Sequence, residues 1–198
     1  NTLAALVVVA IVISLMSFFF WPKVEFGGIT GFVTDTGQVQ VQVQAKTAIN
    51  FTDDTIDWGS GSVTEGYSSC TLDTEGTNGP DCTGFTTQTD GFVIENIGNQ
   101  DVRLEIATGK NASQLLGGTN PLYQFKMANV TGEEGACQGM SPISYTDVNT
   151  TSPGTIVCTN FTAKNSQDEV AIHVKLVIPS DSKTGALSDT FTATATAI

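Results

Sequence analysis

Four cysteines are the residues of this chain whose chemistry is easiest to anticipate. An even number favours two disulfides, for which three pairings exist. We expect Cys70–Cys82 and Cys137–Cys158, because each bond would close a Gly-rich loop with little core of its own. A metal–thiolate site is the alternative, but no two cysteines have the close spacing of zinc ligands, and the only histidine is His173.

No set of residues forms a catalytic constellation. His173 lies in an alternating pattern on the same face as Lys175, where we expect it to be exposed. If every cysteine is oxidised, no free thiol remains to act as a nucleophile. We therefore expect a protein that is not an enzyme, with no catalytic residues, no small-molecule substrate and no cofactor.

Two groups of carboxylates are the remaining candidates for ligands: Asp53, Asp54 and Asp57, and Asp73, Glu75 and Asp81. Either group would offer oxygen ligands to calcium. Neither matches a known calcium loop, and acidic residues are common in turns, so we expect no metal. The net charge of −12, with only eight Lys and Arg residues, argues against a nucleic-acid partner.

Five asparagines fit the acceptor pattern for N-linked glycans. They are Asn50, Asn111, Asn129, Asn149 and Asn160. The chain is rich in Thr and Ser, so some matches arise by chance. We expect at least one of the five to be occupied, since glycans would hydrate a surface with few charges.

The start of the chain is apolar. Residues 1–22 carry no charge, and between Leu3 and Trp21 the only polar residues are Ser14 and Ser17. About 20 residues of helix span the ~30 Å of a bilayer core. Pro22 favours an end to the helix there. The chain begins at Asn1 with this stretch retained, which is typical of prepilin-type cleavage, whereas a secretory signal is cleaved after its apolar region.

One stripe of this predicted helix is a candidate assembly face. Its residues follow a spacing of three and four: Val7, Ala10, Ser14, Ser17 and Trp21. Small side chains in the stripe would let another helix approach closely. The alternative is that Ala and Ser are simply common in membrane helices.

After Pro22 the apolar residues alternate, which is the pattern of half-buried strands. The alternating runs are 38–44, 102–106, 123–127, 170–177 and 190–197. In 38–44 we expect valines toward a core and glutamines toward solvent, although the glutamine row would also suit pairing with a neighbouring subunit. Asn111–Leu116 suggests one short helix, capped by Asn111.

Turn residues separate these short runs, as in an antiparallel β-sandwich. The predicted fold is therefore mainly β: an N-terminal apolar α-helix followed by an antiparallel, Ig-like β-sandwich head. The predicted boundaries are 1–22 for the helix, 23–28 for a hinge and 29–198 for the head.

This layout resembles archaeal type IV pilins and archaellins, and the resemblance rests on the stretch NTLAALVVVAIVISLMSFFFW. It departs from bacterial pilins at Ala5, where they carry a glutamate, and its apolar run is shorter than that of archaellins. The stretches WGSGSVTEGYSSCTLDTEGTN and LVIPSDSKTGALSDTFTATATAI are similar to secreted surface proteins of small-genome archaea. The resemblance implies polymerisation through the N-terminal helix, with the head facing solvent.

The expected function is that of a structural subunit of an extracellular, pilus-like filament at the cell surface. Its partners would be copies of itself, through helix–helix packing, and the membrane before assembly. The alternative is a single-pass, membrane-anchored surface or adhesion protein that does not polymerise. In a third hypothesis each subunit donates a strand to its neighbour, but this needs an N-terminal strand where the pattern favours a helix.

Overall fold

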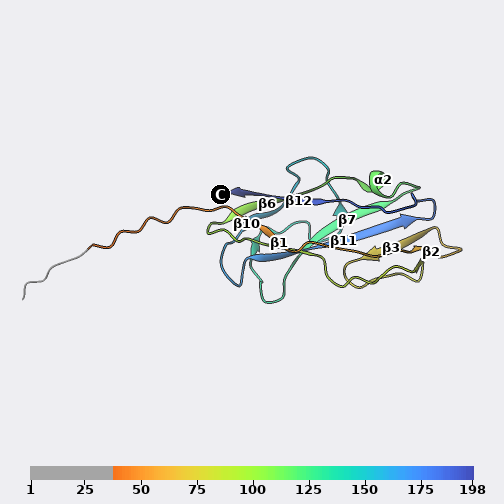
Figure 1. Cartoon of the computed structure of the whole chain (residues 1–198), viewed down its shortest axis with the longest axis horizontal. Helices are drawn as coiled ribbons and strands as arrows, with labels where there is room; N and C mark the ends of the chain where they lie inside the picture. Colours follow the sequence, from red (N-terminus) through yellow and green to blue (C-terminus); the bar gives the residue numbers. More distant parts are fainter. Residues whose placement is uncertain (1–37) are drawn as a thin grey trace, which may run out of the picture. The chain divides into compact units, whose positions relative to one another are not determined.

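The computed structural model describes residues 38–198, which form a mainly β fold (Figure 1). The chain divides into a first unit, Asn1–Gln42, and a compact second unit, Val43–Ile198. The described residues contain these elements: β1 (Asn50–Asp53), β2 (Ser62–Val63), β3 (Ser69–Asp73), β4 (Cys82–Thr83), β5 (Phe92–Glu95), β6 (Val102–Thr108), α2 (Ala112–Leu115), β7 (Leu122–Asn129), β8 (Cys137–Gln138), β9 (Thr146–Asp147), β10 (Thr155–Phe161), β11 (Glu169–Pro179) and β12 (Phe191–Ala197).

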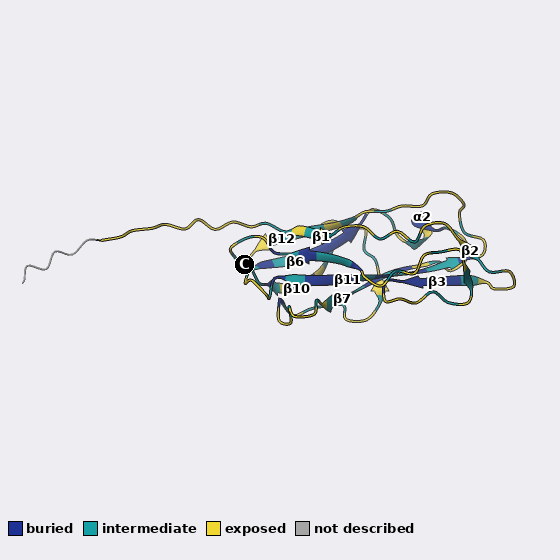
Figure 2. Cartoon of the chain, turned by 60° about the horizontal axis from the view of Figure 1, so that its bottom comes forward, coloured by how far each residue is buried: buried dark blue, intermediate teal, exposed yellow. Residues whose placement is uncertain are grey.

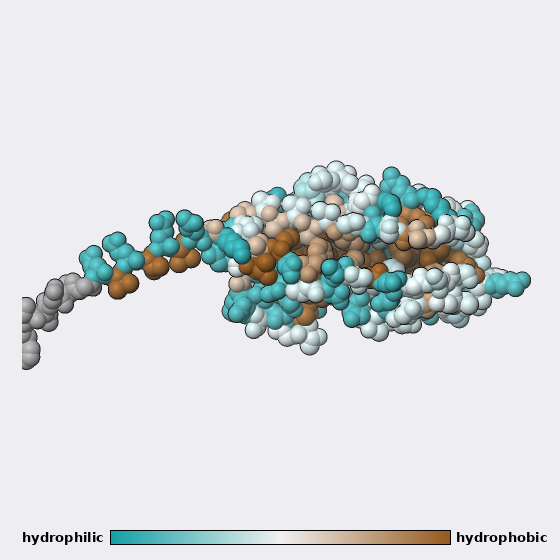
Figure 3. Space-filling view, in the orientation of Figure 1, coloured by the Kyte–Doolittle hydropathy of each residue, from teal (hydrophilic) through white to brown (hydrophobic). Residues whose placement is uncertain are grey.

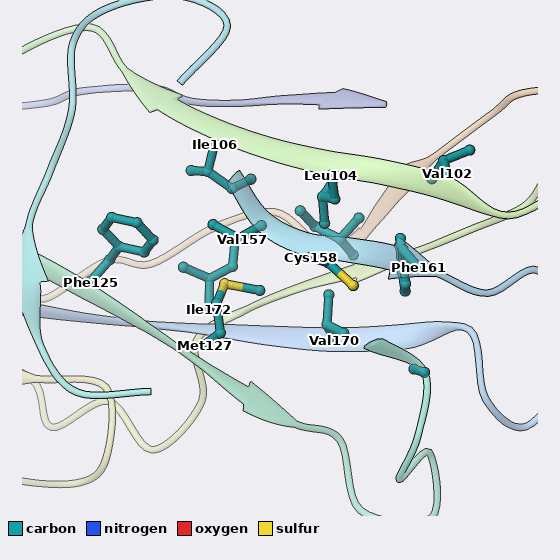
Figure 4. Packing of buried hydrophobic residues seen from close by; sticks show 12 residues of the cluster. Val102, Leu104, Ile106, Phe125, Met127, Val157, Cys158, Phe161, Val170 and Ile172 are labelled. Carbon is teal, nitrogen blue, oxygen red and sulfur yellow. The ribbon is translucent and has the colours of Figure 1, made fainter. Parts of the chain in front are cut away.

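Two antiparallel sheets build the second unit. The larger has the order β1-β5-β11-β7-β9, and β3 also pairs with β11. The smaller has the order β12-β6-β10-β8, while β2 and β4 form a separate short pair. Side chains of β6 and β10 meet those of β7 and β11 between the sheets (Figure 4). The antiparallel β-sheet head expected from the sequence is therefore present.

The core follows the alternation of the long strands. In β7, Tyr123, Phe125 and Met127 are buried, and in β11 the buried series continues through Ile172 and Val174. Because side chains of a strand point to opposite faces in turn, these residues share the inner face of the larger sheet. Figure 2 shows β6, β11 and β3 largely in the colour of buried residues.

One residue outside the strands closes a gap in the larger sheet. Along one edge, β11 pairs with β5 up to Ile172 and with β3 from Lys175 onward. Between them the Thr74 amide donates to the Val174 carbonyl, and the Val174 amide donates to the Thr74 hydroxyl at 3.0 Å. Thr74 thus satisfies the backbone of β11 where its partner strand changes, since buried peptide groups must be paired.

The short helix expected near Asn111 is confirmed. It spans only Ala112–Leu115, and Asn111 is its N-cap. The Asn111 side chain accepts a hydrogen bond from the Gln114 amide at 2.9 Å, and the Gln114 side chain accepts one from the Asn111 amide. This reciprocal capping box satisfies two amides that a helix of this length leaves without partners.

The fold class predicted from the sequence was wrong in one part and is corrected to mainly β. Within residues 38–198 the longest helix is the four-residue α2, and no helix of these residues is long and apolar enough to cross a membrane. Residues 38–198 therefore contain no long apolar helix. The predicted helix over 1–22, its stripe and the hinge over 23–28 lie outside the described residues.

The expectation that 38–44 is a strand with its valines in a core was also wrong. The structure assigns no strand to these residues, and Val39, Val41 and Val43 are 97%, 84% and 77% exposed. Alternation predicts that valines share one side of an extended chain, but it does not supply the neighbouring strand that would bury them. The segment Gln38–Gln44 has no strand partner among the described residues.

Candidate functional site

A group of interacting polar side chains lies on the outer face of the larger sheet. Lys126 of β7 and His173 of β11 are cross-strand neighbours in the register. The Lys126 ammonium lies 2.8 Å from a carboxylate oxygen of Glu75, and the Tyr145 hydroxyl donates to the other oxygen at 3.0 Å. His173 Nδ1 lies 3.1 Å from the Thr74 hydroxyl oxygen. The cluster therefore connects the loop that follows β3, which holds Glu75, with the segment that precedes β9, which holds Tyr145.

The electrostatics of the cluster favour an ionised Glu75 and a protonated Tyr145. The hydrogen bond from Lys126 holds the pKa of Glu75 below its ordinary value, with smaller help from Tyr145. Burial raises the pKa of Tyr145, and its hydrogen bond to Glu75 adds to that effect. The ammonium groups of Lys126 and Lys175 lie 4.9 and 5.5 Å from the centre of the Tyr145 ring, within cation–π range.

The polar groups of this cluster bond to one another and to the backbone, so they are not available to bind a ligand. Lys126 is paired with Glu75, and the Thr74 hydroxyl is also engaged by the Val174 amide. His173 was expected to be exposed, but it is half-buried beside Thr74. We infer that the cluster stabilises the contact between the loop after β3 and the segment before β9.

The ion pair between Glu75 and Lys126 should make a pH-dependent contribution to stability, which can be tested. The folded pKa of Glu75 lies below the ordinary value of 4.5, so the contribution is complete above that value and is lost as the pH falls through the folded pKa. Glu75→Gln should lower the free energy of unfolding at neutral pH by about 0.2–1 kcal/mol, because the Glu75 side chain is 40% exposed and solvent screens its ion pair with Lys126.

Urea unfolding of the parent and of Glu75→Gln, followed from pH 7 to about pH 3, measures this difference. The two should converge at the acidic end. Glu65→Gln removes the same charge from an exposed turn and serves as the matched control. A difference between the parent and Glu75→Gln that does not shrink in acid would contradict the assignment.

Both disulfides are present with the pairing that the loop argument favoured. Cys70 in β3 pairs with Cys82 in β4, with 5.0 Å between their α-carbons. Cys137 in β8 pairs with Cys158 in β10, with 5.6 Å between theirs. The first bond ties the β2–β4 pair to the larger sheet, and the second joins the edge of the smaller sheet to the core, where Cys158 is fully buried. No cysteine of the chain is free.

Three of the six carboxylates singled out as calcium candidates, Asp53, Asp57 and Asp73, accept hydrogen bonds from backbone amides. Asp57 accepts from the Gly59 amide at 2.7 Å, and Asp73 accepts from the amides of Glu75 and Thr77. Asp53 and Asp54 both bond to Thr55. Within residues 38–198 no group of three His, Cys, Asp or Glu side chains is arranged to hold a metal ion.

The five asparagines of the glycosylation pattern differ in exposure. Asn50, Asn111 and Asn129 are exposed, whereas Asn149 and Asn160 are half-buried. The side-chain oxygen of Asn149 accepts from the Thr151 amide, and that of Asn160 is buried without a partner. The first three are therefore better placed on the folded domain, because their side chains reach solvent.

Sequence reasoning missed a third group of carboxylates, which the fold brings together from separate strands and loops. Burial raises the pKa of Asp168, and the nearby Glu133 adds to the rise. Burial also raises the pKa of Glu169, helped by Glu95, its partner in the register. Acidic residues that repel one another across strands have no signature in the sequence, because their spacing along the chain is irregular.

The structure does not place the predicted assembly residues Val7, Ala10, Ser14, Ser17 and Trp21, which lie outside the described part of the chain. The resemblance to archaeal pilins and archaellins stays a prediction. Comparison with family models, with curated proteins and with solved structures finds no match to this chain.

Proposed function

We propose that this chain is an extracellular structural protein of a cell surface, and that it serves as a subunit of a polymer. The observation that carries the proposal is that all four cysteines form disulfides. Disulfides persist in oxidising compartments, which is where an exported protein is found. The net charge of −12 and the exposed asparagines of the glycosylation pattern suit a surface that faces water.

The apolar stretch Leu3–Trp21 supplies a second reason. It is far more apolar than the surface of a soluble protein tolerates, so it must be covered by lipid or by other copies. In the polymer the stretch is covered by its copies, and the sandwich domain stays outside with its polar loops in solvent. The polar cluster around Glu75 is consistent with this proposal, because it links two surface segments of the β-sandwich, the part that would face solvent.

A charge in the apolar stretch tests the proposal. Ala10→Asp places a carboxylate in a stretch that contains no basic residue, and burying an unpaired charge is costly enough to prevent assembly. Ala10→Leu keeps the stretch apolar and is the matched control. Material sheared from the outside of producing cells should contain long polymers, by sedimentation and negative-stain microscopy, for the parent and Ala10→Leu but not for Ala10→Asp.

The outcome that contradicts the proposal is specific. If the parent appears only as monomers released by detergent, the protein is an anchored surface protein that does not polymerise. If Ala10→Asp forms polymers as readily as the parent, the apolar stretch does not hold the assembly together. Non-reducing electrophoresis of each variant verifies that the domain has kept its disulfides.

A further inference from the structure

The last strand of the domain has a free edge. β12 pairs with β6 on one side through seven consecutive residue pairs without a bulge, from Phe191 opposite Thr108 to Ala197 opposite Val102. Its other side has no strand partner among residues 38–198. Proteins usually protect such edges with charges, proline or bulges, because the unpaired backbone groups are a template for another strand. β12 has none of these protections.

The side of the sandwich next to this edge is incompletely covered. Ala193 and Ala195 point toward the core but stay only partly buried, as do Phe51 of β1 and Phe92 of β5. The ring of Phe92 lies 5.9 Å from that of Phe51 and 5.0 Å from that of Phe191, so these aromatic side chains join the two sheets near their open side. Figure 3 shows a band of apolar residues along this face of the domain.

The segment Gln38–Gln44 is suited to pair with the free edge of β12 and to cover the apolar band beside it. It is seven residues long, like β12, and it has neither charge nor proline. Its valines are exposed, and the space-filling view shows apolar and hydrophilic residues on opposite sides of the segment (Figure 3). An extended chain of this kind has a full set of unpaired amides and carbonyls together with one apolar side.

We propose that Gln38–Gln44 of one copy adds as a strand to the free edge of β12 of a second copy. This is β-augmentation, in which backbone hydrogen bonds supply affinity and alternate side chains supply specificity. The period of two would place Val39, Val41 and Val43 on the side of Ala193 and Ala195, over the apolar band. The glutamines would then lie beside the outward-facing threonines of β12.

A second copy is the occupant because of how the segment joins the domain. The Asn99 side-chain amide donates to the Gln44 carbonyl at 2.8 Å, and the Lys46 amide donates to the Asn99 side-chain oxygen at 2.6 Å. The Gln100 side chain also bonds to Thr47. The connecting residues Ala45–Ile49 include no Gly, Pro, Asn or Asp, the residues that dominate tight turns, so they do not favour a return of the segment onto the same copy's β12.

The contact is heterologous, since a segment of one copy meets a different surface of the next. Such contacts repeat from copy to copy and generate rings or open filaments. The inference thus rests on the proposed polymer and names a contact between its successive subunits. It also explains how an unprotected edge avoids indiscriminate pairing, because the edge is occupied in the assembly.

Cross-linking between variants of the full chain that each carry one added cysteine tests the pairing, since the four native cysteines are held in disulfides. Gln38→Cys, Gln40→Cys and Gln42→Cys provide three donors. Thr192→Cys, Thr194→Cys and Thr196→Cys provide three acceptors, and Thr150→Cys, in an exposed loop, is the control acceptor. Each donor is mixed with each acceptor, oxidised with diamide and resolved by non-reducing electrophoresis. Directly opposite side chains in paired strands lie about 4.5–5.5 Å apart at Cβ, so one ordered series of pairs should cross-link and also reveal the strand direction.

A charge on the apolar side supplies a second measurement. Val41→Asp in the donor should lower the yield of the strongest cross-link by at least about tenfold, because the carboxylate would be buried without a partner. In a donor that carries its cysteine at position 38 or 40, Gln42→Asp adds the same charge on the hydrophilic side of the same segment and should leave the yield nearly unchanged. Neither residue belongs to the core of the domain, so the fold is preserved in both variants.

Several outcomes would overturn the inference. Equal yields for all donor and acceptor pairs, or for the Thr150→Cys control, would show random collision. Homodimers of Thr194→Cys that form without any donor would show pairing between two β12 edges. An internal link that forms at high dilution in a chain carrying a donor cysteine and an acceptor cysteine would show that the segment pairs with β12 of its own copy. Polymers without ordered cross-links would contradict the strand contact alone. Ordered cross-links without polymers would contradict the proposed polymer and support the strand contact.

Discussion

Reduction of both disulfides is expected to lower the free energy of unfolding of the domain by about 6 kcal/mol. The bonds close loops with sequence separations of 12 and 21 residues. Constraining loops of these lengths in the unfolded chain contributes about 3 kcal/mol each in the chain-entropy treatment. Domains of this size are stable by only about 5–15 kcal/mol, so reduction should leave the domain close to unfolding.

Denaturant unfolding with and without dithiothreitol measures the combined effect, and two double variants separate the bonds. They are Cys70→Ala with Cys82→Ala, and Cys137→Ala with Cys158→Ala. The variant with all four substitutions is the control, since reductant should not change its stability. A loss of less than about 1 kcal/mol on reduction of the parent would contradict the expectation, given the usual 2–5 kcal/mol for native disulfides of small secreted domains.

Phe161→Ala is expected to lower the free energy of unfolding by about 3–5 kcal/mol, the usual cost of truncating a buried phenylalanine. Phe161 is fully buried at the end of β10, opposite Val102 of β6 and Cys137 of β8 in the register. Figure 4 shows its ring in the layer of core side chains between the sheets, near Val170. Truncation removes these contacts and leaves a cavity that the surrounding strands cannot fill.

Ile156→Ala is the matched control, because Ile156 lies in the same strand but is 44% exposed. Its loss should be close to the ±0.5 kcal/mol that is usual for surface substitutions. Urea unfolding at neutral pH compares the two variants, and an unchanged slope with denaturant verifies that the unfolded states are comparable. Similar losses for Phe161→Ala and Ile156→Ala would show that the end of β10 does not belong to the core.

The sequence by itself determined the features that depend on neighbours along the chain. The alternation around Phe125 and Ile172 predicts strands, because successive side chains of a strand point to opposite faces. The helix at Asn111 is likewise local, since its cap and capping box involve residues three positions apart. The disulfide pairing could be expected for the same reason, because each pair closes a short loop.

Only the tertiary structure decided which patterned segments are buried and which polar groups meet. Gln38–Gln44 alternates as regularly as β11, yet it stays exposed, because burial needs a neighbouring strand that alternation does not encode. Glu75, Lys126 and Tyr145 come from three separate parts of the chain, and their meeting depends on the register of β7 with β11 and on the loop after β3. The unprotected edge of β12 is decided in the same way: its composition is visible in the sequence, but its place at the end of a sheet follows from the order of strands in space.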